Sequence, residues 1–159
     1  MDLVVTLFDE DALASLLSNE SYRAKLVQQL VDAAVQGNAD GINVDFELLP
    51  HSVKDQFVDF ILELGSALWA VKEDAEISLA MPAIDWDGAY DYDLLAAASD
   101  FLFIMCYGYH WSGGDPGPNA PIFGEGPFTN YGIKWTIDDY VEWGGDSVLD
   151  NLVIGLPVY

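Results

Sequence analysis

One eight-residue stretch, Asp-Gly-Ile-Asn-Val-Asp-Phe-Glu at positions 40–47, constrains the fold of this chain more than any other part. Apolar and polar side chains alternate in it, as in a β-strand, where successive side chains point to opposite faces. The polar face carries Asn43, Asp45 and Glu47. Burying ionisable groups is unfavourable unless they are paired or hydrogen-bonded. The stretch therefore predicts either the exposed face of an edge strand or a strand whose polar face lines a functional cavity. Its apolar residues and the helical pattern that follows favour the cavity.

Predicted strands and helices alternate along the rest of the chain. Runs of apolar and β-branched residues predict strands at residues 3–8, 41–46, 77–81, 101–107 and 152–156. Apolar residues at helical spacing predict helices at residues 20–36, 53–71, 92–98 and 137–143. This alternation predicts an α/β fold, with a parallel sheet and crossover helices.

Local signals mark where some helices begin. Residues 9–18 are expected to form a loop that includes at most a helical turn. Ser18 or Asn19 can cap the helix that follows, because a short polar side chain accepts hydrogen bonds from the first free backbone N–H groups. Ser52, with Asp55 three residues later, resembles a capping box at the start of the next helix.

Charge and cysteine content restrict the partners of the chain. It has 27 acidic and 5 basic residues, a formal net charge of −22, so nucleic acid and anionic membranes are poor partners. Cys106 is the only cysteine, which excludes an internal disulfide and a thiolate metal site. His51 and His110 share no metal-ligand spacing, and we expect no metal and no cofactor. The sequence starts without a signal-peptide pattern and has no apolar run long enough to span a bilayer.

The stretch at 40–47 resembles the signature strand of glycoside hydrolase family 18, the chitinase-like family, which reads Asp-Gly-x-Asp-x-Asp-x-Glu. Four residues match it: Asp40, Gly41, Asp45 and Glu47. Asn43 stands where the family more commonly has aspartate. The resemblance implies a (β/α)8 TIM-barrel type fold, which needs about 250 residues.

The chain is expected to form only part of such a barrel. It has 159 residues and about five β/α units, which resemble the third to the seventh strands of the family. We therefore expect residues 1–159 to be a partial family 18 catalytic barrel domain, cut at both ends, that does not close an eight-stranded barrel by itself. The rest of the barrel would come from missing flanking sequence or from another chain, or the isolated piece would be poorly soluble.

Glu47 is the expected catalytic acid. It would lie at the C-terminal end of its strand, where barrel active sites lie, and Asp45 on the same face would raise its pKa by like-charge repulsion. Two carboxyl groups so close on one strand cannot flank a sugar from both sides, so a different nucleophile is implied. By the family resemblance, the substrate's N-acetyl oxygen attacks the anomeric carbon, Glu47 protonates the leaving oxygen and Asp45 polarises the acetamido group. Asn43 and Asp40 would support Asp45, although an amide cannot share a proton with it as a carboxyl can.

A second stretch, Met-Cys-Tyr-Gly at positions 105–108, resembles Met-x-Tyr-Asp at the end of the family's sixth strand. Met105 and Tyr107 match, and Gly108 replaces the aspartate. The resemblance implies that Tyr107 hydrogen-bonds the acetamido group and that the missing aspartate would have bound sugar hydroxyls. Met105 could equally be core filling.

Aromatic residues gather in the loops that follow the predicted strands. Residues 108–135 are rich in glycine, proline and aromatics, and a loop of this length in a compact domain is usually functional. Trp86, Tyr109 and Trp111 would either stack on sugar rings or pack between long loops.

The leading hypothesis is a retaining, substrate-assisted glycosidase that acts on β-1,4-linked N-acetylglucosamine polymers, either chitin or peptidoglycan-type glycans. An extracellular or cell-envelope location follows by resemblance. The main alternative is a catalytically weak or inactive carbohydrate-binding relative, which the absence of aspartate at position 108 favours and the pair Asp45 and Glu47 opposes. A third hypothesis is that the chain is a truncated piece that folds only with a partner chain or within the full-length protein.

The acidic composition predicts that salt stabilises this protein more than a typical domain. Only 5 basic side chains offset 27 acidic ones, so self-repulsion destabilises the compact state and added ions screen it. Thermal unfolding should show the melting temperature rising from low to molar sodium chloride. A flat melting temperature over this range would mean that the acidic surface does not limit stability.

Overall fold

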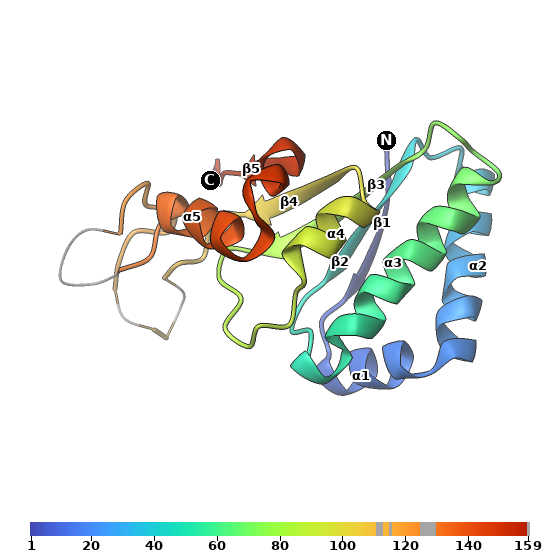
Figure 1. Ribbon diagram of the computed structural model, residues 1–159, viewed down its shortest axis with the longest axis horizontal. Helices are drawn as coiled ribbons and strands as arrows, with labels where there is room; N and C mark the ends of the chain where they lie inside the picture. The colour runs from blue at the N-terminus through green and yellow to red at the C-terminus, as the bar shows by residue number, and fades with distance from the viewer. Residues whose placement is uncertain (111–112, 115, 125–129, 159) are drawn as a thin grey trace.

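The computed structural model describes residues 1–110, 113–114, 116–124 and 130–158. The strands in these ranges form one parallel sheet whose order follows the sequence, β1-β2-β3-β4-β5 (Figure 1). The strands are β1 (Leu3–Leu7), β2 (Gly41–Phe46), β3 (Glu76–Pro82), β4 (Phe101–Met105) and β5 (Leu152–Gly155). The α-helices are α1 (Glu10–Ser18), α2 (Glu20–Gly37), α3 (Lys54–Trp69), α4 (Tyr92–Ala98) and α5 (Ile133–Gly144). Two 3-10 helices, η1 (His51–Val53) and η2 (Asp146–Asn151), precede α3 and β5.

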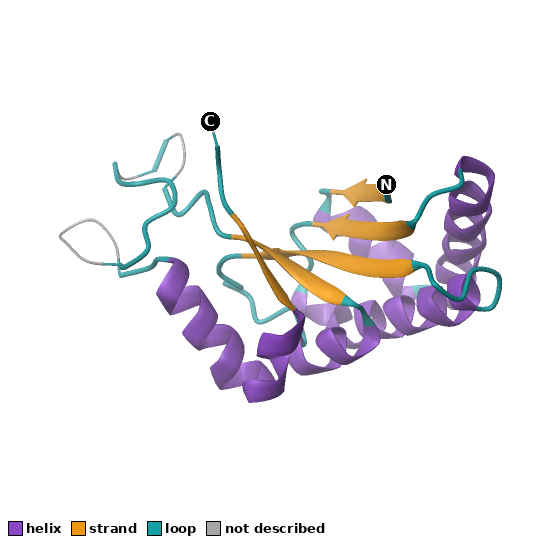
Figure 2. Cartoon of the chain, turned by 90° about the horizontal axis from the view of Figure 1, so that it is seen from above, coloured by secondary structure: helices purple, strands orange, loops and turns teal. Residues whose placement is uncertain are grey.

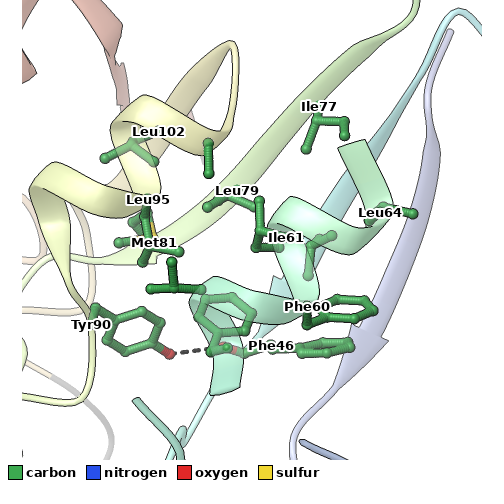
Figure 3. Close-up of a cluster of buried hydrophobic side chains, with 14 of the residues drawn as sticks. Phe46, Phe60, Ile61, Leu64, Ile77, Leu79, Met81, Tyr90, Leu95 and Leu102 are labelled. Atoms are coloured by element: carbon green, nitrogen blue, oxygen red, sulfur yellow. Dashed lines mark hydrogen bonds between the residues drawn. The ribbon is translucent and has the colours of Figure 1, made fainter. Parts of the chain in front are cut away.

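All the helices lie on one side of the sheet (Figure 2). On the three central strands, the residues that face them are apolar and fully buried. They are Ile42, Val44, Phe46, Ile77, Leu79, Met81, Leu102 and Ile104. Figure 3 shows several of them packed against α3, where the rings of Phe46 and Phe60 stack with centroids 5.6 Å apart. This layer is the hydrophobic core.

No helix within the described ranges lies over the other side of the sheet (Figure 2). On β2 this side carries Asn43 and Asp45, which are half-buried. The alternate residues Ile42, Val44 and Phe46 face the helices and are fully buried. The predicted alternation of β2 is therefore confirmed. An open parallel sheet with helices on one face is the arrangement of an incomplete (β/α)8 barrel, in which the uncovered face would be the barrel interior.

The prediction for residues 9–18 was wrong, because they form helix α1. Asp9 caps it, since its side chain accepts a hydrogen bond from the backbone N–H of Ala12 at 2.8 Å. Leu13 and Leu17, one helical turn apart, are fully buried in the core. Leu13, Leu16 and Leu17 have helical spacing, but they span little more than one turn, so the period is weak in the sequence.

The predicted helix caps had mixed outcomes. Asn19 caps α2, because its side-chain oxygen accepts hydrogen bonds from the backbone N–H groups of Ser21 and Tyr22. The capping box at Ser52 was wrong: Ser52 lies inside η1, and α3 starts after Val53 without a side-chain cap. The 3-10 turn moves the start of α3 past the serine.

Gly41 is required by the close approach of two strands, which yields a testable prediction. A Cβ atom at this position would lie 2.3 Å from the carbonyl oxygen of Glu76, the facing residue on β3. Gly41→Ala should lower the free energy of unfolding by about 1–3 kcal/mol, the usual cost of overpacking, measured by denaturant titration. Gly37→Ala is the matched control, since nothing lies within 4 Å of its Cβ position. Equal stability of the two variants would contradict the close approach.

Candidate active site

Glu47 lies directly after β2, at the C-terminal edge of the sheet. Its backbone N–H donates a hydrogen bond to the carbonyl of Leu7 at the end of β1, at 3.1 Å. Its side chain is half-buried and belongs to the uncovered side of the sheet, like that of Asp45 two residues earlier. The C-terminal edge of a parallel barrel sheet is where such folds bind ligands.

Two adjoining clefts meet at Glu47. The larger, about 320 Å³, is lined by Glu47, Pro82, Ala83, Ile84, Trp86, Met105, Tyr107, Gly108 and Tyr109. The smaller, about 200 Å³, is lined by Glu47, Leu48, Leu49, Pro82, Ile84, Asp85, Trp86, Asp87, Tyr90 and Met105. Glu47, Trp86 and Met105 line both clefts, so a ligand that extends through the two would pass the carboxyl group of Glu47.

The pKa values of Asp45 and Glu47 are both raised above their usual values. Burial raises the pKa of Asp45. Burial also raises the pKa of Glu47, and the negative charge of Asp45 adds to this increase. One carboxylate oxygen of Asp45, Oδ1, is buried and has no hydrogen-bond partner among the residues that the structure describes. A buried carboxylate oxygen of this kind is ready to accept a hydrogen bond from a ligand.

Asn43 points toward β3. Its side-chain amide donates a hydrogen bond to the hydroxyl of Ser78 at 2.8 Å. Ser78, which faces Asn43 in the register, is a buried polar residue that sequence reasoning missed. A single serine in an otherwise apolar strand was the signal that could have drawn attention to it.

The other predicted ligand-binding residues divide into two groups. Met105, Tyr107 and Trp86 line the clefts, and Trp86 is 66% exposed. Tyr109 also lines the larger cleft but is nearly buried, and its hydroxyl lies 2.6 Å from the hydroxyl of Thr136. This contact with α5 favours a packing role for Tyr109. Trp111 lies outside the described residues.

Asp40 does not lie with the other candidates. It precedes β2, at the opposite end of the strand from Glu47. Its carboxylate is largely exposed and pairs with the N-terminal amino group of Met1, which lowers its pKa. The structure therefore places it away from the clefts.

Aromatic residues beyond the predicted set extend the site. The ring of Trp86 meets the ring of Tyr131 edge-on, with centroids 5.2 Å apart, and Tyr131 meets Trp135 in the same way at 4.7 Å. Tyr131 and Trp135 were missed because they lie about 45 residues or more from Trp86 in the sequence. Only the fold brings these rings together.

The described part of the chain offers no metal site and no membrane span. No group of three or more His, Cys, Asp or Glu side chains in this part could hold a metal ion. Each of its helices is too short or too polar to cross a bilayer.

The incomplete barrel and its carboxyl pair define a (β/α)-barrel protein with a candidate acid site, and the comparisons identify its family. The sequence pattern described as glycosyl hydrolases family 18 matches residues 8–159, and the chain belongs to this family.

Individual relatives agree with the family assignment. The chain is 32% identical over 157 residues to the Bacillus subtilis protein YdhD, a sporulation-specific glycosylase by name, covering 96% of this chain and 34% of that protein. It is 27% identical to rat di-N-acetylchitobiase, covering 98% of this chain and 42% of that protein. The crystal structure of YdhD matches with a TM-score of 0.83 at 28% identity, covering 99% of this chain and 52% of that one. The chain thus spans about a third to two-fifths of the length of these two relatives.

The raised pKa of Glu47 predicts an unusual effect on stability. Because this pKa is higher in the folded than in the unfolded chain, the folded state binds more protons between the two values, and stability falls as the pH rises through this window. Glu47→Gln should therefore raise the melting temperature at pH 7. The gain should shrink as the pH falls below the unfolded pKa of glutamate, about 4.3.

The matched control for this prediction is Glu73→Gln. Glu73 is exposed on the turn after α3, and its substitution removes the same charge from the acidic total. Thermal unfolding of the parent and both variants at several pH values separates the local effect from general self-repulsion. If Glu47→Gln raises the melting temperature no more than Glu73→Gln does, the site does not destabilise the Glu47 carboxylate.

Proposed function

We propose that this chain carries the catalytic carboxyl pair of a retaining glycosidase that hydrolyses β-1,4-linked N-acetylglucosamine polymers. The observation that carries the proposal is the pair itself, Glu47 at the meeting point of two clefts with Asp45 behind it on the same face. A general acid must be protonated near the working pH, and burial together with a neighbouring carboxylate raises the pKa of Glu47 in the required direction.

The two carboxyl groups lie two residues apart at the end of one strand, so the substrate supplies the nucleophile. Glu47 donates its proton to the glycosidic oxygen, the bond from this oxygen to the anomeric carbon breaks, and the substrate's acetamido oxygen bonds to that carbon. Asp45 accepts a hydrogen bond from the acetamido N–H, for which its buried Oδ1 is available. Water then attacks the anomeric carbon from the face that the leaving group occupied, and the bond from the acetamido oxygen to this carbon breaks. The Glu47 carboxylate takes the proton of the water, and the configuration is retained.

The named relatives support this class of substrate. They include the rat di-N-acetylchitobiase and a Bacillus subtilis cortical fragment-lytic enzyme, which is 28% identical over 122 residues. A mutant chitinase domain from Ostrinia furnacalis, 26% identical with a TM-score of 0.80, was crystallised with an N-acetylglucosamine oligomer. Chitin and peptidoglycan-type glycans share the N-acetyl group that the proposed mechanism requires.

A second candidate function, carbohydrate binding without hydrolysis, is favoured by Gly108. This residue stands where the family motif has aspartate, and its backbone has φ of +74°, in the region that favours glycine. Its N–H donates a hydrogen bond to the side chain of Asn119 at 2.9 Å. The larger cleft thus lacks one carboxylate that would contact sugar hydroxyls, while it keeps Tyr107 and Trp86.

Hydrolysis of a chromogenic chitobioside tests the proposed function, with this chain and with the full gene product assayed side by side. We expect the β-anomer as first product by NMR and no comparable rate on the glucose analogue. Glu47→Gln should lower kcat by about 10²–10⁴-fold, the range for loss of a general acid, while oligosaccharide binding persists. Glu73→Gln should leave kcat unchanged.

Three results would contradict the glycosidase assignment. They are an inverted first product, equal rates on the glucose analogue, and a Glu47→Gln rate within tenfold of the parent. Binding of chitooligosaccharides by the full gene product without hydrolysis would establish the second candidate.

A further inference from the structure

The turn after β2 holds Glu47 next to a strained residue. Leu48 has φ of +58°, in the left-handed region that non-glycine residues rarely adopt. Its side chain is 67% exposed, so its own burial does little to hold this conformation. Such strain persists only where the surrounding structure fixes the backbone.

The peptide group between Phe46 and Glu47 is fixed from two sides. Its N–H, from Glu47, donates to the carbonyl of Leu7 at 3.1 Å. Its carbonyl, from Phe46, accepts a hydrogen bond from the hydroxyl of Tyr90 at 2.8 Å, which Figure 3 marks. The paired residues of β2 and β3 end at Val44 and Leu79.

The hydroxyl of Tyr90 takes the place of a missing backbone donor. If the register of β2 and β3 continued, the carbonyl of Phe46 would face the nitrogen of Pro82, which has no hydrogen to donate. The Tyr90 hydroxyl therefore holds the backbone directly before the two-residue segment Glu47–Leu48.

Tyr90 itself is held firmly in the loop between β3 and α4. It is 7% exposed, and its ring meets Phe57 of α3 edge-on with centroids 6.0 Å apart. The carboxylate of Asp85 accepts hydrogen bonds from the backbone N–H groups of Ala89 and Tyr90, at 3.0 and 2.9 Å. Burial, with the charge of Asp85, raises the pKa of Tyr90, so its hydroxyl stays a donor at neutral pH.

We propose that Tyr90 is a positioning residue for catalysis, whose hydroxyl clamps the Glu47–Leu48 turn and so fixes the direction of the Glu47 carboxyl group. The proposal rests on the proposed function of Glu47 as general acid. A loop residue 43 positions away in the sequence thus fixes the backbone geometry on which proton transfer from Glu47 depends.

The test removes the hydroxyl alone, by Tyr90→Phe in the full gene product. We expect kcat on a chromogenic chitobioside to fall by about ten- to a hundredfold, the effect of a misplaced catalytic group, with KM within about twofold of the parent. Hydrogen exchange at the backbone N–H groups of Glu47 and Leu48 should become at least about tenfold faster, because local opening becomes easier.

Tyr92→Phe is the matched control. Tyr92 is an equally buried tyrosine on α4, stacked on Tyr140 with centroids 3.8 Å apart, and its hydroxyl donates to the carboxylate of Asp139 at 3.4 Å. This variant should lose comparable thermal stability while keeping kcat and the exchange rates at Glu47 and Leu48. All rates are measured at a temperature well below every melting point.

A milder variant covers the case in which Tyr90→Phe does not fold. Asp85→Asn replaces one carboxylate oxygen that accepts a hydrogen bond from a backbone N–H of the loop, and it leaves the Tyr90 hydroxyl in place. We expect kcat to fall by a smaller factor than in Tyr90→Phe. Unchanged exchange at Glu47 and Leu48 in folded Tyr90→Phe would overturn the clamp, as would equal kcat losses in Tyr90→Phe and Tyr92→Phe. If the parent hydrolyses nothing, the proposed function is wrong, and the exchange rates alone decide whether Tyr90 fixes the turn.

Discussion

The two faces of β2 are the constraint on which the rest of this structure depends. Its apolar side packs into the core, where Phe46 stacks on Phe60 of α3, so the strand cannot rotate or slip by one residue without burying its carboxyl groups. The same packing fixes Asp45 on the opposite side and places Glu47 at the edge of the sheet. Hydrophobic burial on one face thus supplies the rigid support that an acid site requires.

The rigid placement of Asp45 and Glu47 costs electrostatic free energy at the site. A chain with net charge −22 places two more carboxyl groups in a partly desolvated position, where burial raises the pKa of both. Two such groups stand next to two clefts, and Asp45 Oδ1 lacks a partner within the described ranges. Perturbed carboxyl groups in a cleft mark a candidate functional site.

The side of the sheet that carries the carboxyl pair is also the side over which the described part of the chain places no helix (Figure 2). In the matched YdhD structure this chain covers 52% of the length, so the related fold contains further segments beyond the part compared. In this chain, the two clefts at Glu47 are formed by the central strands and their loops, chiefly through Trp86, Met105 and Tyr107.

The sequence by itself determined the alternation of strands and helices, the carboxyl face of β2 and the family, because periodicity and a short motif are local properties of the chain. It did not reveal α1, because this helix is short and its leucines, Leu13, Leu16 and Leu17, span little more than one helical turn. Nor did it reveal the bonds from Asn43 to Ser78 and from Tyr90 to Phe46, which join residues 35 and 44 positions apart. Such contacts were decided only by the tertiary structure, since the register of parallel strands and the path of their loops determine which side chain reaches which backbone atom.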